Sequence, residues 1–417
     1  MLVHPLLLAF SMVAVVAIVM GGCAREVPLA VDPSLPLDEA LAAWQQELGV
    51  PGMAVGVYYG DAVQLQRGFG VADRATGRPV EATTPFCVGS IAKLFVGTAA
   101  LRLATRGVLA LDAPLATWRP DVPGADRATL QMLGTHQAGY RNYITLPAVK
   151  DTFSAAPERL WTRAELLALS LAAEPHFGPG AGWVYSNANA LLLVEALERA
   201  TALPWDSLLA REVLRPAGLA ATTRVAEGCT AMAPGAARGY QLGDAEGPTP
   251  WTVAGDSLHD VSGDALSKWD ASGDLRSTVP DLRRFLDAAF RGDVLSPEAR
   301  ARRGATVATG EADYRYGFAL EVWDAGPAQT LGHCGVVPGY NACLSYRPHD
   351  DVAVVVLTNV YGTQRSAMPA RALTEALLVW TTAQASAAQA THTEPPGWST
   401  EPDAEVRARA GYMSRVG

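Results

Sequence analysis

Apolar and polar residues alternate in two short runs near the start of the chain, at 53–59 and 62–68, which are joined by Gly60-Asp61. Alternation with a period of two around a glycine-containing turn predicts a β-hairpin. Four more strand-like runs lie near the other end, at 316–323, 328–334, 341–346 and 352–357. Because helical patterns fill the middle, we expect an α+β fold: one antiparallel sheet built from both chain ends, flanked by helices, with a helical second lobe inserted. A site would lie between the lobes.

Four segments have the apolar spacing of helices: 37–48, 91–106, 188–200 and 366–381. The second ends at Gly107, which is a typical helix stop. In the last, Ser366 is the expected N-cap, and Pro369 is tolerated because it falls in the first turn. These patterns predict a folded domain over 37–381, followed by a disordered tail at 382–417 that is rich in Ala, Thr, Pro and Gln.

The first 22 residues have the pattern of a signal peptide of the lipoprotein type, since residues 6–20 are uncharged and mostly apolar. The small residues before Cys23 resemble the lipobox of bacterial lipoproteins, in which that cysteine carries the lipid. Residues 23–36 then read as a tether. We expect an exported protein of the cell envelope or periplasm, held at the membrane only through this N-terminus. An uncleaved single-span anchor and a plain cleaved signal are the alternatives.

The formal net charge is −9, the sequence pI is about 5.3, and no cluster of Lys and Arg occurs. This composition argues against nucleic acid or anionic lipid as the main partner. A small molecule or a peptidoglycan peptide is the expected substrate. The cysteines and histidines lack the close pairings of a zinc site, so we expect no metal and no organic cofactor.

Lysine is scarce, with three lysines against thirty arginines, and Lys93 stands three residues after Ser90. Arginine cannot be deprotonated in proteins, whereas a buried lysine can act as a base. Residues at i and i+3 share a helix face, so the Ser90 hydroxyl and the Lys93 amine can meet in one cleft. Such a Ser-x-x-Lys motif arises by chance in about one chain in eight of this composition, so it needs support.

Two downstream segments supply that support. Tyr185 and Asn187 follow a Pro-Gly turn and precede an apolar helix. Tyr185 could shuttle protons if two cations lowered its pKa, and the Asn187 amide could donate to and accept from a substrate amide. A second Tyr-x-Asn at 140–142 lacks this context. A core tyrosine is the alternative for Tyr185.

His333 and Gly335 form the third element, on a predicted strand. His333 could hydrogen-bond or carry charge near a substrate carboxylate, and Gly335 would let backbone approach a ligand closely, with the Val336 N–H facing the site. The other His-x-Gly, at His176, lies in a loop where a solvated histidine is expected. Cys334 and Cys343 flank a turn centred on Pro338-Gly339 and could pair as a disulfide or remain buried thiols.

Ser-x-x-Lys, Tyr-x-Asn and His-x-Gly, in this order, resemble the penicillin-recognising serine hydrolases, in particular the branch of class C β-lactamases, D-alanyl-D-alanine carboxypeptidases and esterases. The likeness extends from about residue 37 to 380 and includes the segments 107–112, 133–139 and 214–219. It implies a β-lactamase/transpeptidase-like fold. Lysine is commoner than histidine at position 333 in this family, and threonine or serine at positions 334 and 336.

The resemblance implies acyl transfer through an acyl-enzyme in the cell envelope, on D-alanyl peptides, β-lactams or esters. Ser90 would attack the carbonyl, Lys93 and Tyr185 would move its proton, and the N–H groups of Ser90 and Val336 would hold the oxyanion. Asn187 and His333 would position the substrate. The rival hypothesis is an envelope binding protein that keeps the fold without catalysis.

Overall fold

The computed structural model describes residues 28–225, 233–248, 253–325 and 328–390. The predicted signal peptide and the lipidation site Cys23 lie outside these residues, as does the segment 391–417 of the predicted tail. None of the helices within the described ranges has the length and apolar character that crossing a membrane requires.

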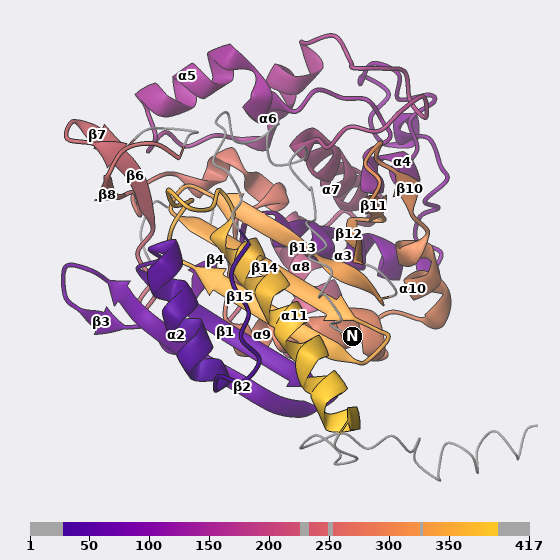
Figure 1. The fold of residues 1–417 in the computed structure, drawn as a ribbon. Helices are drawn as coiled ribbons and strands as arrows, with labels where there is room; N and C mark the ends of the chain where they lie inside the picture. Colours follow the sequence, from indigo (N-terminus) through magenta and orange to yellow (C-terminus); the bar gives the residue numbers. More distant parts are fainter. Residues whose placement is uncertain (1–27, 226–232, 249–252, 326–327, 391–417) are drawn as a thin grey trace, which may run out of the picture.

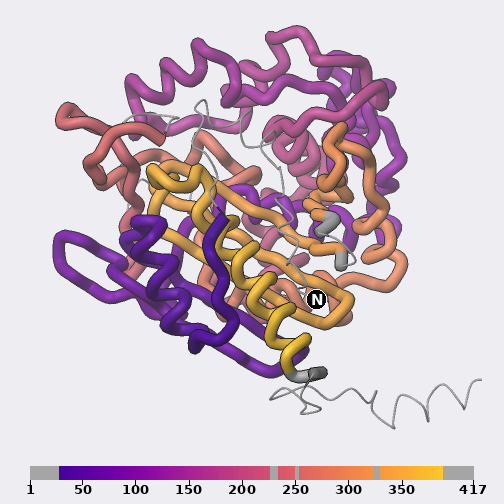
Figure 2. Tube along the Cα trace, viewed as in Figure 1, coloured from indigo at the N-terminus to yellow at the C-terminus, as the bar shows by residue number. Residues whose placement is uncertain are grey.

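A nine-stranded antiparallel sheet forms the centre of the molecule, in the order β10-β11-β12-β13-β14-β15-β1-β2-β3. The strand β1 from the N-terminal part pairs with β15 from the C-terminal part, with Val55 opposite Val356. The sheet is therefore assembled from both chain ends, as the hydrophobic pattern predicts (Figure 2). Its strands are β1 Gly52–Tyr59, β2 Ala62–Asp73, β3 Arg78–Pro79, β10 Val307–Ala308, β11 Tyr314–Gly317, β12 Leu320–Ala325, β13 Ala328–Val337, β14 Tyr340–Arg347 and β15 Val352–Thr358.

Helices cover both faces of this sheet (Figure 1). The helices α2 (Leu37–Leu48) and α11 (Pro369–Ala390) pack on one face, against alternate side chains of β1 and β15 such as Val55 and Val354. The intervening residues, such as Ala54 and Val355, join a second core with the helical part of the chain. Burial on both faces explains why β15 is apolar at every residue before Thr358.

The middle of the chain forms the helical lobe, which lies above the sheet in Figure 1. Two small three-stranded sheets, β4-β9-β5 and β7-β6-β8, accompany it. The helices outside α2 and α11 are α3 Ala92–Thr105, α4 Leu130–Gly134, α5 Pro147–Ala155, α6 Arg163–Leu171, α7 Asn187–Thr201, α8 Trp205–Leu209, α9 Val279–Leu286 and α10 Pro297–Gly304. The small strands are β4 Phe86–Cys87, β5 Thr223–Arg224, β6 Tyr240–Asp244, β7 Gly247–Pro248, β8 Ser257–Asp260 and β9 Leu275–Ser277.

Three predicted segments differ from the structure. The run 316–323 was expected as one strand but is split between β11 and β12, because Ala319 adopts a positive φ of 51° and reverses the chain. The last helix begins at Pro369, so Ser366 is not its N-cap, and it continues through residue 390, so that 382–390 of the predicted tail is helical. Residues 28–36 of the predicted tether lie on the domain, where Leu29 is buried and the Trp44 indole donates to the Ala30 carbonyl.

Candidate active site

Ser90 lies in a single 3₁₀ turn, Gly89–Ile91, directly before α3. The helix was expected to begin at Ile91 and begins at Ala92, one residue later. The turn keeps the i, i+3 relation, and the Lys93 Nζ lies 3.0 Å from the Ser90 Oγ. The same nitrogen donates to the Ser272 carbonyl at 2.9 Å. Two contacts from separate parts of the chain thus fix the amine beside the hydroxyl.

Lys93 is almost completely buried, with 1% of its surface exposed. Burial lowers the pKa of its amine well below the ordinary 10.5, and the nearby Glu321 opposes this effect only in part. The amine therefore favours its neutral form, which has a lone pair that can accept a proton from Ser90. Arginine could not accept this proton, which is consistent with a lysine at this position in a chain that has thirty arginines and only three lysines.

Two glycines bring β13 against the turn that carries Ser90. A Cβ at Gly335 would lie 2.6 Å from the Ser90 backbone nitrogen and closer still to the Val88 carbonyl oxygen. A Cβ at Gly89, which has a positive φ of 51°, would lie 2.6 Å from the Val336 nitrogen. Side chains at either position would therefore separate the backbone of Ser90 from that of Val336. Gly335 thus permits a backbone-to-backbone contact, in addition to any approach to a ligand.

Tyr185 precedes α7 and faces the Ser90–Lys93 pair, with the Lys93 Nζ 4.9 Å from the centre of its ring. Burial raises the pKa of Tyr185 well above 10, and hydrogen bonding with Ser90 offsets this only in part. The condition under which Tyr185 was expected to shuttle protons, a pKa lowered by two cations, is therefore not met. The phenol stays protonated, so it can pass a proton on but cannot serve as the resting base.

Asn187 and Asn142 lie side by side, and the Asn187 backbone N–H donates to the Asn142 Oδ1 at 3.4 Å. Both side chains are 2% exposed. Within the described part of the chain, the Asn187 Oδ1 and the Asn142 Nδ2 have no hydrogen-bond partner. The sequence pattern did not predict Asn142 as a site residue, because its Tyr-x-Asn motif lacks a Pro-Gly turn. The Tyr-x-Asn motif at 140–142 is visible in the sequence, but only the fold shows that its asparagine, and not its tyrosine, lines the cavity.

His333 was expected to bind substrate and lies instead beneath the site. Its ring is 1% exposed and is not among the residues that line the cavity beside Ser90. The Nδ1–H donates to the Cys334 carbonyl, which leaves the Nε2 to accept from the Tyr316 hydroxyl at 3.0 Å. Burial, with the nearby Lys93, lowers the pKa of His333 to about 3. The expected charge near a substrate carboxylate is therefore absent, because both ring nitrogens are used inside the protein.

A cavity of about 190 Å³ joins these elements. Among the predicted residues it is lined by Ser90, Tyr185, Asn187, Gly335 and Val336. The sequence did not assign the others to a site, although it marked Cys334 as a possible disulfide cysteine and Asn142 as part of a rejected Tyr-x-Asn. It gave no signal for Glu321, because a lone acidic residue on a strand is usually solvated. The additional lining residues are Asn142, Ile144, Trp183, Val184, Trp269, Thr309, Glu311, Tyr314, Glu321, Cys334, Met368 and Arg371.

The family model described as Beta-lactamase matches residues 37–378 of the chain. The chain belongs to the beta-lactamase family. A Bacillus subtilis (strain 168) protein assigned as penicillin-binding protein PbpX is 25% identical over 325 residues, which cover 78% of this chain and 74% of that protein. A D-aminopeptidase of Cereibacter sphaeroides (strain ATCC 17023) is 28% identical over 327 residues, 78% of this chain but only 59% of the relative.

Among solved structures, a D-stereospecific amidohydrolase from Streptomyces sp. superposes with a TM-score of 0.69 and 26% identity, over 80% of this chain and 96% of that one. The relatives of this beta-lactamase family member include hydrolases of several kinds, with an esterase, EstB of Burkholderia gladioli, among them. Membership therefore establishes a family of serine hydrolases with the β-lactamase/transpeptidase-like fold.

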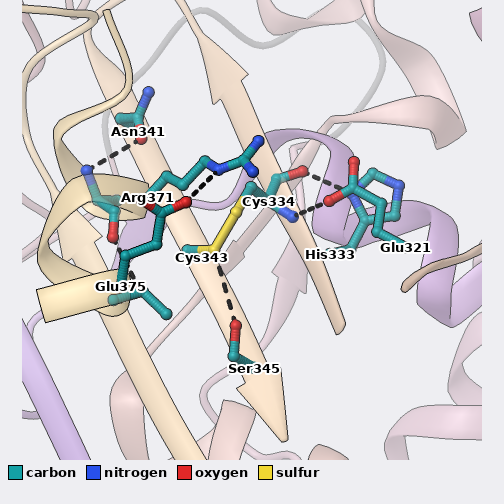
Figure 3. Close-up of a disulfide and its surroundings, with 10 residues drawn as sticks. Glu321, His333, Cys334, Asn341, Cys343, Ser345, Arg371 and Glu375 are labelled. Carbon is teal, nitrogen blue, oxygen red and sulfur yellow. Dashed lines mark hydrogen bonds and ion pairs between the residues drawn. A yellow bond between two sulfur atoms is a disulfide. The ribbon is translucent and has the colours of Figure 1, made fainter. Parts of the chain in front are cut away.

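In this family member, Cys334 and Cys343 lie opposite each other on β13 and β14 and are joined by a disulfide, as the turn position predicts (Figure 3). Glu321 and His333 lie on one side of this bond, and Arg371 and Glu375 lie on the other (Figure 3). The disulfide therefore ties together the two strands behind the Ser90 turn.

His136 belongs to the segment 133–139 that carries part of the family resemblance, although its role was not predicted. Its ring centre lies 4.4 Å from that of Tyr185, and its Nδ1 accepts from the Asn189 side chain at 3.0 Å. Burial lowers its pKa well below 6.5. A neutral, hydrogen-bonded ring thus supports one side of Tyr185.

Proposed function

We propose that this chain is a serine hydrolase that forms an acyl-enzyme on Ser90 and cleaves amides or esters of D-amino acids, with D-alanyl peptides and β-lactams as related substrates. The observation that carries the proposal is the 3.0 Å contact between the Ser90 hydroxyl and the buried amine of Lys93, whose pKa burial lowers. The names of the relatives, a D-aminopeptidase and a D-stereospecific amidohydrolase, support the D configuration and the amide bond.

In the proposed first step, the Ser90 oxygen attacks the substrate carbonyl while the Lys93 amine takes the hydroxyl proton. The negative charge that develops on the carbonyl oxygen is held by the backbone N–H groups of Ser90 and Val336. The close packing of Gly89 and Gly335 supports this role, because it brings the backbone of Val336 beside the turn that carries Ser90.

Tyr185 completes the proton path in this proposal. Its protonated phenol donates to the leaving nitrogen or oxygen and recovers a proton from Lys93, which returns to the neutral amine. The raised pKa of Tyr185 and the lowered pKa of Lys93 support this division, since they make the amine the base and the phenol the acid. A water molecule then attacks the acyl-enzyme by the reverse path.

We place the protein in the cell envelope, anchored through a lipid on Cys23. The apolar run at 6–20 and the small residues before Cys23 support this location, and a disulfide is compatible with an oxidising compartment. Cell fractionation of the wild type and of Cys23→Ser checks it, since the variant should leave the membrane fraction.

The hydrolase proposal is tested by labelling the full chain with a fluorophosphonate probe and mapping the modified peptide by mass spectrometry. We expect one label on Ser90 and none on the Ser90→Ala variant. The matched control is Ser257→Ala, which removes an exposed hydroxyl far along the chain and should label like the wild type. A wild-type protein that carries no label, or a Ser90→Ala variant that keeps it, would contradict the proposal.

A further inference from the structure

The cavity beside Ser90 is lined by more acidic than basic side chains. Its charged lining side chains are Glu311, Glu321 and Arg371. The Arg371 guanidinium forms an ion pair at 2.9 Å with Glu375, which does not line this cavity. Lys93 is not among the lining residues, and burial lowers the pKa of its amine. A positively charged group on the substrate would therefore be attracted, and a carboxylate would be repelled.

Glu321 lies on β12 opposite Gly332 of β13, close to the strand segment that contains Gly335 and Val336. The residue is only 9% exposed. Its Oε2 accepts the Cys334 backbone N–H at 2.9 Å, and its Oε1 lies 3.5 Å from the Nδ1 of the neutral His333 ring. Within the described residues, no lysine or arginine nitrogen lies within ion-pair distance of this carboxylate.

A buried carboxylate with no cation at ion-pair distance is costly, because water no longer solvates its charge. In agreement with this cost, burial raises the pKa of Glu321 to about 7, although the Cys334 N–H, Arg371 and Lys93 oppose the shift. A cation from the substrate would place a counter-charge closer to this carboxylate than Arg371, which acts on it from beyond ion-pair distance. The cavity therefore favours a ligand that carries a positive charge.

The two asparagines of the same cavity complement this group. The Asn187 Oδ1 is an acceptor and the Asn142 Nδ2 is a donor, and both are buried without a partner in the described structure. Together they match one N–H and one carbonyl of a ligand. A primary ammonium has three donors, so it can bind a carboxylate and an amide oxygen at the same time.

Resting on the proposed function, we propose that Glu321 binds the ammonium group of the substrate, so that the preferred substrates are amino acid amides or esters, or peptides, with a free amino terminus. The Asn187 Oδ1 shares the ammonium, and the Asn142 Nδ2 holds a substrate carbonyl. Substrates whose amino group is acylated lack the charge and bind poorly. This assignment replaces the carboxylate-binding role that the sequence suggested for His333.

The experiment compares D-alanine p-nitroanilide with N-acetyl-D-alanine p-nitroanilide on the full chain. For the wild type we expect kcat/KM to be at least tenfold higher for the free amine. In Glu321→Gln the amide oxygen can still accept the Cys334 N–H but carries no charge. We expect the ratio of the two kcat/KM values to fall about tenfold or more, mainly through a higher KM for the free amine. The control Glu174→Gln removes an exposed carboxylate and should keep the wild-type ratio.

A second measurement needs no variant. D-alaninamide should protect wild-type Ser90 from the fluorophosphonate probe at a concentration at least tenfold lower than N-acetyl-D-alaninamide. Protein that is labelled on Ser90 but shows no preference for the free amine in either assay, or prefers the acetylated compound, overturns the inference and leaves the hydrolase proposal standing. An equal loss on both anilides in Glu321→Gln also overturns it. Protein that is not labelled at all overturns the hydrolase proposal itself.

Discussion

At the scale of single residues, the proposed proton transfer depends on one amine whose pKa burial lowers. Lys93 contacts both the Ser90 hydroxyl and the Ser272 carbonyl, and the Tyr185 ring covers it. No exposed lysine has these properties, because water stabilises its ammonium form. The chemistry of the site therefore depends as much on the side chains that exclude water as on the lysine itself.

Lys93→Arg keeps a long basic side chain but removes the capacity to accept a proton. We expect the rate of acylation, measured by single-turnover reaction with a p-nitrophenyl ester, to fall about 10³-fold, within the range typical of a lost general base. The control is Lys150→Arg, since this lysine lies outside the cavity and should keep the wild-type rate. An acylation rate within threefold of the wild type would show that another group is the base.

The contacts of individual residues were predictable only where spacing along one element determines them. Lys93 and Ser90 share a helical turn, so three residues of separation sufficed to pair them. Asn142 and Glu321 come from a loop and a strand far from Ser90 in sequence, and only the assembled fold brings them to the cavity. The burial that reverses the expected pKa of Tyr185 likewise comes from several distant segments.

At the scale of elements, the site depends on the contact between β13 and the turn Gly89–Ile91. Two glycines, Gly89 and Gly335, make this contact possible, because a Cβ added at either position would meet the backbone of the other segment. The sequence predicts glycine for close backbone approach at position 335, but the partner of that approach is a turn of this chain. Only the fold shows that Gly335 approaches the Ser90 turn, because the sequence of one strand does not show which segment lies beside it.

Gly335→Ala should separate β13 from the Ser90 turn. Because the added methyl group would meet backbone atoms, which cannot swing aside, we expect kcat/KM on a p-nitrophenyl ester to fall at least 10²-fold and stability to fall by about 1–3 kcal/mol. Urea unfolding and steady-state kinetics measure the two effects. Gly304→Ala, where no atom lies near the added Cβ, should change neither quantity appreciably. Unchanged activity in Gly335→Ala would argue against the oxyanion role of Val336.

At the scale of the whole molecule, two buried histidines near the site also make the stability of the fold depend on pH. His136 and His333 are both held neutral by burial, and the pKa of His333 falls to about 3. Each folded-state pKa lies below the unfolded value near 6.5, so the unfolded chain binds more protons below that pH. The contribution of these rings is therefore complete above pH 6.5 and is lost as the pH falls toward the folded pKa.

Urea unfolding at several pH values between 7 and 5 checks this dependence. Each of the two histidines contributes a fall in the free energy of unfolding of up to about 1.4 kcal/mol per pH unit, whereas buried acids with a raised pKa, such as Glu321 and Asp274, contribute in the opposite direction. The test is therefore the difference between the wild type and His333→Gln, in which we expect the histidine-dependent part of the fall to shrink by about half. His349→Gln, which replaces an exposed histidine, should leave the slope unchanged. Equal slopes in the wild type and His333→Gln would contradict the assignment of His333 as a buried neutral ring.

The architecture of the whole molecule was the most predictable level. Strand patterns at both ends and helical patterns between them indicated a sheet shared by the two ends, and the pairing of β1 with β15 confirms it. The errors concern boundaries: a reversal at Ala319, and segments at 28–36 and 382–390 that pack or continue as a helix. Local composition favoured a loop or tail there, whereas contacts with distant parts of the chain determine the outcome.

The order of the segments along the chain also determines when the site can form during synthesis. Ser90 and Lys93 emerge from the ribosome early, whereas β13, with Gly335 and Val336, follows only after the whole helical lobe. The central strand β15 comes later still, and β1 has no partner on that side until it arrives. A growing chain therefore carries the proposed nucleophile without an assembled cavity, and the order of synthesis itself delays the proposed reaction until the domain is complete.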